Sequence, residues 1–154
     1  MPITRQADYA IRAVLDLALQ PTGARVASVD IARRQGIPLA FLFKILARLA
    51  AEGLVYTQRG ARGGTWLAGS SAQITLLQVV EAIDGPFALN RCARQPCDCV
   101  RNQMCVIHPV WFELCCEFRA RLASYTFATI AAQTGQGVSP ASSLTTLFEA
   151  LPLG

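Results

Sequence analysis

Apolar residues recur at helical spacing through the first third of the chain and predict three helices there. The first begins after Thr4, whose side chain can cap it, and the second covers residues 29–35 with Ser28 as its cap. A third helix opens at Pro38 and presents five inward positions: Leu39, Leu42, Ile45, Leu46 and Leu49. Because a tight Gln-Gly-Ile-Pro turn joins the second helix to the third, the pair predicts a helix-turn-helix.

A hairpin is expected directly after the third helix. Residues 54–58 and 65–68 have the composition of β-strands, and the glycine-rich sequence RGARGG at 59–64 forms the turn between them. A hairpin that follows a helix-turn-helix is a wing. Thr75 then caps a further helix, which a Gly-Pro pair at 85–86 breaks.

A loop and one long helix complete the expected elements. Residues 86–107 show no regular periodicity and are too many for an idle connection inside a compact domain. A last helix is expected from His108 to about residue 132 because Pro109 suits a first turn. Its broad apolar face consists of Trp111, Phe112, Leu114, Cys115, Phe118, Leu122 and Tyr125. So wide a face on a small protein predicts pairing with a second copy.

Composition excludes several classes of protein. Hydrophobic residues make up 53% of the 154 residues and charged residues 16%, which excludes wholesale disorder. Four charged residues between Arg5 and Asp16 interrupt the first apolar segment, so it lacks the core of a signal peptide. The longest uncharged stretch, 122–148, is broken by glycine and proline. We therefore expect a cytoplasmic protein that crosses no membrane.

Charge is distributed unevenly along the chain. Residues 1–68 carry nine Arg or Lys against four acidic residues, whereas residues 69–154 carry five against six. A basic N-terminal half suits a polyanion such as DNA. In a winged helix-turn-helix the third helix enters the major groove, and the wing reaches the backbone or the minor groove. The expected DNA contacts are Arg33, Arg34, Ala40, Phe41, Lys44, Arg48, Arg59 and Arg62.

These eight residues have different expected roles. Lys44 is the strongest candidate for a base or phosphate contact, while Ala40 and Phe41 offer apolar contact to thymine methyl groups. The arginines of the second helix and of the wing are expected on phosphates. The alternative is a helical protein-interaction module whose arginines form a solvated face. The ordered set of helix, turn, helix and basic hairpin favours DNA.

Thiols and one imidazole concentrate in a single segment. Within seventeen residues lie Cys92, Cys97, Cys99, Cys105 and His108. Six cysteines in a chain expected in the cytosol indicate metal or redox chemistry rather than disulfides. A loop without regular structure can wrap three or four such ligands around one metal centre.

Thiolate ligands of this kind hold iron–sulfur clusters. Three alternatives to such a cluster compete for this segment. A structural zinc site uses the same set of three cysteines and a histidine. A reversible thiol switch between Cys97 and Cys99 is a second alternative, although a Cys-x-Cys ring is strained. A cysteine hydrolase is disfavoured, because the single histidine is close in sequence and no oxyanion site is indicated.

Several motifs resemble those of one family. They are TRQADYAIRAVLD at 4–16, FLFKILARLAAEGLVYTQRGARGG at 41–64, the segment 74–84, and Tyr125-Thr126. With the wing and the cysteine loop, they are similar to the Rrf2 family of transcription regulators, that of IscR, NsrR and RirA, over residues 1–133. The resemblance implies a homodimer whose long C-terminal helices cross, and an iron–sulfur cluster whose state sets the affinity for DNA.

The resemblance implies two possible ligand sets. The first, which looks like the IscR pattern for a 2Fe–2S cluster, is Cys92, Cys99, Cys105 and His108. Its Cys-x5-Cys-x2-His spacing and the following Trp111 match that pattern, and Cys97 is the substitute for Cys99. In the second set, Asp8 of the other subunit completes a 4Fe–4S site, as in the NsrR pattern. We favour the first set.

Some of these residues also have a structural role open to them. His108 can cap the last helix, and Asp8 can pair with Arg12 four residues further on. Cys115 and Cys116 point about 100° apart on a helix, so at most one of them lines a core.

Together these observations predict a mainly α protein with a small β-wing, built as a winged helix-turn-helix plus a long C-terminal dimerisation helix. We expect a DNA-binding domain at 1–84, a cysteine-rich cluster-binding loop at 85–107, the dimerisation helix at 108–133 and a mobile tail at 134–154. The expected function is that of a transcription regulator, a repressor and not an enzyme, which binds a near-palindromic duplex. Whether the signal is cluster supply, iron, nitric oxide or redox state stays open.

Overall fold

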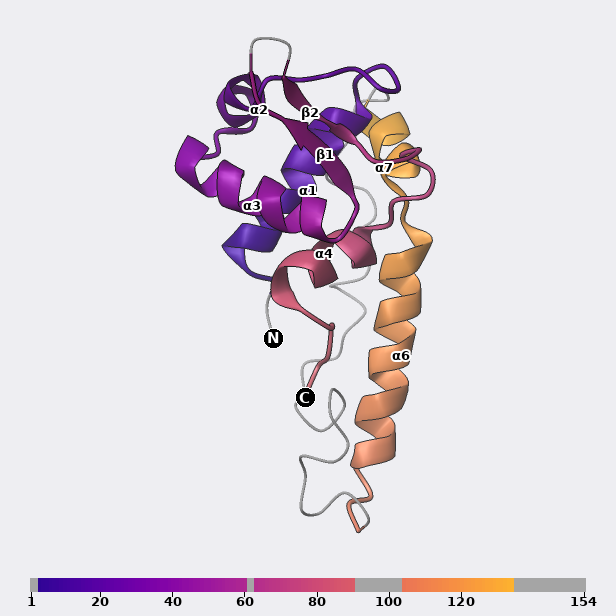
Figure 1. Cartoon of the computed structure of the whole chain (residues 1–154). Helices are drawn as coiled ribbons and strands as arrows, with labels where there is room; N and C mark the ends of the chain where they lie inside the picture. The colour runs from indigo at the N-terminus through magenta and orange to yellow at the C-terminus, as the bar shows by residue number, and fades with distance from the viewer. Residues whose placement is uncertain (1–2, 61–62, 91–103, 135–154) are drawn as a thin grey trace.

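Residues 3–60, 63–90 and 104–134 are described by the computed structural model of the chain, which Figure 1 shows. Its elements, in chain order, are α1 (Arg5–Ala18), α2 (Ser28–Gln35), α3 (Leu39–Ala51), β1 (Val55–Gln58), β2 (Gly64–Leu67), α4 (Leu76–Asp84), α6 (His108–Ser124) and α7 (Phe127–Thr134). This series of helices around a two-stranded sheet confirms the predicted mainly α fold with a β-wing. No helix within the described ranges is both long and apolar enough to cross a membrane.

The core forms around α1, which contacts α2, α3, α4 and α7. Ala7, Ala10 and Ala13 are fully buried, and their small side chains let the neighbouring helices approach α1 closely. Phe127 of α7 is the largest fully buried side chain among the described residues and lies in the same cluster. Thr4 caps α1 as predicted, because its hydroxyl accepts a hydrogen bond of 3.2 Å from the Ala7 amide.

α2 and α3 form the predicted helix-turn-helix. Gly36 ends α2 in a left-handed conformation, with φ of 61°, which glycine adopts without strain. Four of the five predicted inward positions of α3 are buried, and Leu39 is partly buried against the core. The predicted cap of α2 is wrong. Ala27 is the N-cap, and the Ser28 hydroxyl instead lies 3.4 Å from the Thr65 hydroxyl of β2.

β1 and β2 pair as an antiparallel hairpin, the predicted wing, in which Val55 lies opposite Leu67. An isolated bridge between Val26 and Thr65 fastens β2 to the chain just before α2. The wing is therefore attached through β2 to the chain just before the helix-turn-helix. Figure 1 shows it beside α3.

α4 joins the winged domain to the C-terminal helix α6, with which it is in contact. Thr75 caps α4, as predicted, and forms a capping box with Gln78. At the other end of α4, the Asp84 carboxylate accepts hydrogen bonds from the Thr4 hydroxyl at 2.6 Å and the Thr4 amide at 3.1 Å. Both the start of the described chain and its long C-terminal helix are therefore fastened to α4.

The structure corrects the single helix predicted from His108 to about residue 132. Tyr125 is extended and follows the end of α6, and α7 is a separate helix. Thr126 forms an isolated antiparallel bridge with Thr75, just before α4. The break is stabilised because it inserts Phe127 into the core. α6 itself extends away from the winged domain as a long arm (Figure 1).

Candidate functional site

α3 presents an exposed surface on the side opposite its buried stripe. The predicted contacts Ala40, Phe41, Lys44 and Arg48 are all exposed on it. The Lys44 Nζ atom lies 5.9 Å from the centroid of the Phe41 ring, within reach of a cation–π interaction. The structure thus brings four predicted DNA contacts onto one face of one helix.

A groove of about 570 Å³ lies between the exposed side of α3 and the wing, which α3 also contacts through β1. Phe43, Leu46 and Ala47 line it from α3, and Thr57 and Arg59 line it from the wing side. The Phe43 side chain is 54% exposed, although it stands close to the buried Leu42 and Leu46 in the sequence. Phe43 is not among the contacts predicted from the sequence, and the signal that could have identified it is an aromatic residue out of phase with the apolar stripe.

The cations of this surface differ in how they are paired. Within the described part of the chain, Arg48 and Arg59 take part in no ion pair and are exposed. Arg33 pairs with Asp30 at 3.0 Å, but its side chain is 77% exposed, and such surface pairs contribute little. Arg33 therefore stays available to a phosphate. Arg62 lies outside the described residues.

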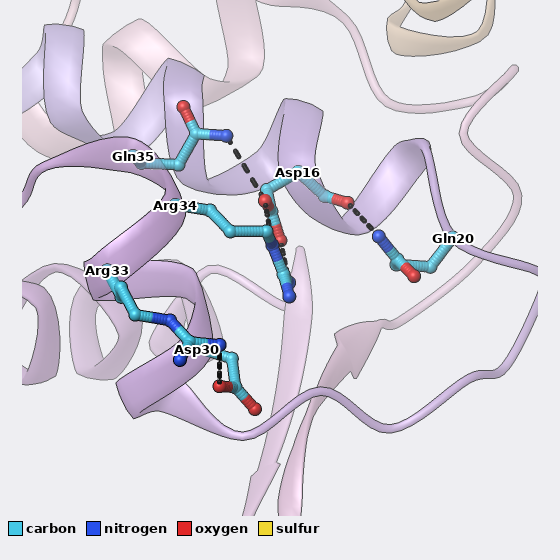
Figure 2. Close-up of polar contacts among 6 residues, drawn as sticks. All are labelled: Asp16, Gln20, Asp30, Arg33, Arg34 and Gln35. Atoms are coloured by element: carbon cyan, nitrogen blue, oxygen red, sulfur yellow. Dashed lines mark hydrogen bonds and ion pairs between the residues drawn. The ribbon is translucent and has the colours of Figure 1, made fainter.

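Arg34 has a different environment, which Figure 2 shows. Its Nε and Nη2 atoms donate to the two carboxylate oxygens of Asp16 at 2.9 and 2.6 Å. Gln35 donates to the same carboxylate at 3.1 Å, and the Asp16 side chain is only 4% exposed. The hydrogen bond to Asp16 is the main cause of a raised pKa of Arg34, against the opposing effect of desolvation, so the guanidinium stays charged.

This arrangement favours a positioning role for Arg34 over the predicted phosphate contact. Asp16 lies on α1 and Arg34 on α2, so their ion pair holds the first helix of the helix-turn-helix against the core. Asp16 is not among the site residues predicted from the sequence. Its signal is an acidic residue inside the apolar stripe of the first predicted helix.

Asp8 and Arg12 form the predicted ion pair, at 3.2 Å between Oδ2 and Nη2. Arg12 reaches further, because its Nη1 donates to the backbone carbonyl of Gln35 at 2.9 Å. Gln35 is the last residue of α2, directly before the turn into α3. Asp8 is thus connected through Arg12 to the turn of the helix-turn-helix.

Only some of the candidate metal ligands are among the described residues. The positions outside the described ranges are Cys92, Cys97 and Cys99. Cys105 and His108 are described and share one turn, in which the His108 amide donates to the Cys105 carbonyl at 3.2 Å. Among the described residues, no three side chains of His, Cys, Asp or Glu are grouped to hold a metal ion.

His108 does not cap α6, which is the structural role that its position in the sequence allowed. Ile107, not His108, is the N-cap of α6, and no side chain caps that helix. The Nδ1 atom of His108 is buried and has no hydrogen-bond partner among the described residues. Buried polar atoms are nearly always paired, so this atom fits a ligand beside Cys105. The donor set of thiolate and imidazole suits iron–sulfur clusters and zinc alike.

The segment that leads from α4 toward the cysteines is held by contacts with both α4 and α6. Glu81 of α4 accepts a hydrogen bond of 2.7 Å from the Phe87 amide and forms an ion pair with Arg119 of α6. The Cys115 thiol donates to the Phe87 carbonyl at 3.5 Å, and the Phe87 and Phe118 rings lie 6.4 Å apart. We name Glu81, Phe87, Cys115 and Arg119 the Phe87 clamp. Cys115 is buried and Cys116 exposed, which confirms that only one of the two lines the core.

Comparison with known proteins identifies relatives along nearly the whole chain. The profile of the Rrf2 family, described as iron-dependent transcriptional regulators, matches residues 3–133. The HTH-type transcriptional regulator IscR of Cronobacter sakazakii is 35% identical over 114 residues, which cover 74% of this chain and 70% of that protein.

Two solved structures are similar in fold. IscR of T. potens has a TM-score of 0.70 at 22% identity, with 96% of each chain covered. CymR, the global cysteine regulator of B. subtilis, has a TM-score of 0.68 at 20% identity, covering 86% of this chain and 98% of that one. The same architecture therefore occurs in regulators that bear different names.

Proposed function

The chain belongs to the Rrf2 family of transcriptional regulators, which are not enzymes, and we propose that it is a sequence-specific DNA-binding repressor controlled by an iron–sulfur cluster. The observation that carries DNA binding is the exposed surface of α3, with Lys44 and Arg48 on it, beside the wing side that carries Arg59. A helix of this kind fits the major groove, and the wing reaches the adjoining backbone. Its place of action is the cytoplasm, where bacterial DNA lies.

The regulator is proposed to act as a homodimer through residues 108–133. Phe112 and Phe118 on α6 are 51% and 52% exposed, an apolar surface that a second copy can cover. Residues 1–84 then form the DNA-binding domain and 85–107 the cluster loop. A two-fold symmetric dimer presents two copies of α3, so its preferred duplex is near-palindromic.

The cluster is proposed to be held by Cys92, Cys99, Cys105 and His108, with Cys97 as the substitute for Cys99. The shared turn of Cys105 and His108 and the unpaired Nδ1 atom support this set. A 2Fe–2S cluster is favoured. When bound, the cluster supplies a centre whose charge and integrity change with redox state, iron supply or nitric oxide. The partner's Asp8 and a 4Fe–4S cluster form the alternative.

A second candidate is a regulator of the same fold without a cluster. Three cysteines and one histidine also suit a structural zinc ion, and paired thiols suit a redox switch. The fold does not favour either candidate, because IscR and CymR share it.

Two routes connect the ligands with the DNA-binding surface. The Phe87 clamp holds the chain before the cysteines against α4, which packs on α1 and α3. Asp8 is connected through Arg12 to the Gln35 carbonyl at the turn before α3. Binding of a cluster to the cysteines can therefore change the position of the helix-turn-helix, and cluster loss is expected to change DNA affinity about tenfold or more.

Selection of duplexes from a random-sequence DNA library tests DNA binding directly. The wild-type chain is expected to enrich near-palindromic duplexes and to bind them less tightly as salt rises, because basic side chains displace counterions. Lys44→Ala is expected to alter the enriched sequence more than Arg59→Ala does. Failure of the wild type to enrich any sequence, with and without its metal, would favour the protein-interaction module instead.

A further inference from the structure

The outer face of the wing carries an aromatic patch, which we define as Arg25, Tyr56 and Trp66. Tyr56 and Trp66 are cross-strand partners in β1 and β2, and their ring centroids lie 5.7 Å apart. The Arg25 guanidinium lies 4.6 Å from the centroid of the Trp66 ring, and its Nη1 donates to the Gln58 side chain at 2.8 Å. Neither the proposed DNA contacts nor the proposed metal ligands include the patch.

This face of the hairpin is open, whereas the opposite face is packed. Val55 and Leu67, the neighbouring cross-strand pair, point to the other side, where Val55 is fully buried and Leu67 packs against the core. On the outer face, the Tyr56 side chain is 53% exposed. Tyrosine, tryptophan and arginine are the residue types that carry most binding energy in interfaces. The patch therefore has the composition of a surface that another segment covers.

We propose that residues 144–151 of the same chain dock on the aromatic patch. These residues belong to the tail predicted as mobile and lie outside the described part of the chain. Their apolar side chains recur at positions i, i+3, i+4 and i+7, the spacing of one helical face: Leu144, Leu147, Phe148 and Leu151. Docking gives the hairpin a second covered face and joins the tail to the DNA-binding domain, and a two-stranded hairpin gains stability from such packing.

Charge supports this occupant. Glu149 is the only charged residue between 135 and 154, and its sign is opposite to that of Arg25. A guanidinium has five N–H donors, so the bond from Arg25 to Gln58 is compatible with a further one to a carboxylate. The segment thus offers an apolar face for the two rings and one carboxylate for the cation.

The end of α7 places the tail within reach of the wing. The Ala128 amide donates to the carbonyl of Ser71 at 3.1 Å, and Ser71 lies on the chain that leaves β2. Figure 1 shows α7 beside this stretch. The nine residues 135–143 separate Thr134 from the segment, and when extended they span about 30 Å. That span is about the diameter of a small domain, so the segment can reach the outer face of the wing.

Acrylamide quenching of Trp66 fluorescence tests the docking in the full chain. Trp111→Phe leaves Trp66 as the only tryptophan, and all variants are compared on this background in the same metal state. Phe148→Ser is expected to raise the quenching constant about twofold, because a large aromatic side chain no longer shields the indole. Leu153→Ser, the matched control, changes an apolar residue outside the segment and is expected to leave the constant unchanged.

A charge reversal tests the ion pair separately. Glu149→Lys is expected to raise the quenching constant, because it places a cation beside Arg25. Adding Arg25→Glu to that variant is expected to restore the low value, since the two charges again attract. Acrylamide is neutral, so its local concentration does not follow these charges. The double variant is needed because Arg25→Glu alone also removes the guanidinium from the Trp66 ring.

Equal quenching in the reference chain, Phe148→Ser and Glu149→Lys would overturn the proposal, and neither tail variant touches the described core. Shielding of Trp66 by an added duplex in those variants would then assign the patch to DNA. The readout involves neither DNA nor a cluster, so failure of this proposal is distinguishable from failure of the proposed function.

Discussion

Arg34 and Asp16 form a two-point ion pair in which the Nε and Nη2 atoms donate to separate carboxylate oxygens at 2.9 and 2.6 Å. The pair joins α2 to α1 and places its carboxylate in the core, as Figure 2 shows. Such geometry adds orientation as well as attraction, because the planar guanidinium and the carboxylate meet in parallel. The first helix of the helix-turn-helix is therefore held at a defined angle to the core.

Arg34→Ala is expected to destabilise the fold by about 2 kcal/mol, since it leaves the buried Asp16 carboxylate with only the Gln35 amide. Arg33→Ala is the matched control. Its pair with Asp30 is exposed, so its loss should change stability by no more than about 0.5 kcal/mol. Urea unfolding of both variants measures the difference.

The same two variants separate positioning from phosphate contact. Arg33→Ala should lower the salt slope of DNA binding by about 0.9, as expected for one lost phosphate contact. Arg34→Ala should weaken binding with little change in slope. Equal stability of the two variants, with equal loss of slope, would show that Arg34 also acts on DNA as the sequence predicted.

Protein purified without oxygen is expected to be brown and to contain iron and acid-labile sulfide. Cys105→Ala should lose most of both, because this thiol is a proposed ligand in every set considered. Cys116→Ala is the control, since Cys116 is exposed on α6 and has no proposed role. If each chain instead holds one firmly bound zinc ion and no sulfide, the site is a structural zinc site and the iron–sulfur proposal is wrong.

His108→Ala is expected to change the visible absorption and the reduction potential of the cluster, because it removes one of the proposed ligands. Asp8→Asn keeps the size of the side chain and should leave both signals nearly unchanged. It should weaken only the ion pair to Arg12. The opposite result, with a broad 4Fe–4S absorption in the wild type, would assign the fourth ligand to the partner's Asp8.

Arg119→Ala removes the ion pair that α6 makes with Glu81 in the Phe87 clamp. We expect the variant to bind a cluster but to show a smaller ratio between the DNA affinities of its cluster-bound and cluster-free forms, by about threefold or more. Coupling free energies of about 1–3 kcal/mol are typical, so this reduction is measurable by DNA titration. Arg121→Ala is the matched control, because Arg121 lies over the Tyr125 ring outside the clamp. An unchanged ratio in Arg119→Ala would exclude the clamp as a coupling route.

Local patterns in the sequence were sufficient for most of the fold. Helical spacing of apolar residues located α1 to α4, and Thr4 and Thr75 marked two helix starts, because capping depends on residues three positions apart. The Asp8–Arg12 pair follows from the same short-range geometry. The family resemblance covered the residues that the Rrf2 profile matches.

Relationships between distant residues needed the tertiary structure. Arg34 looked like any other basic residue, and only the packing of α2 on α1 showed that Asp16 binds it. The break at Tyr125 is invisible to periodicity, because it depends on the Thr75–Thr126 bridge and on space in the core for Phe127.

The candidate sites divide in the same way. Sequence determined which residue types are present, namely the basic wing, the cysteines and His108, and hence the classes of partner they suit. Tertiary structure decided that Phe43 faces the wing across a groove and that Ile107, not His108, occupies the N-cap position of α6. The physical reason is that spacing along a chain specifies local conformation, whereas contacts between elements depend on how all of them pack around one core.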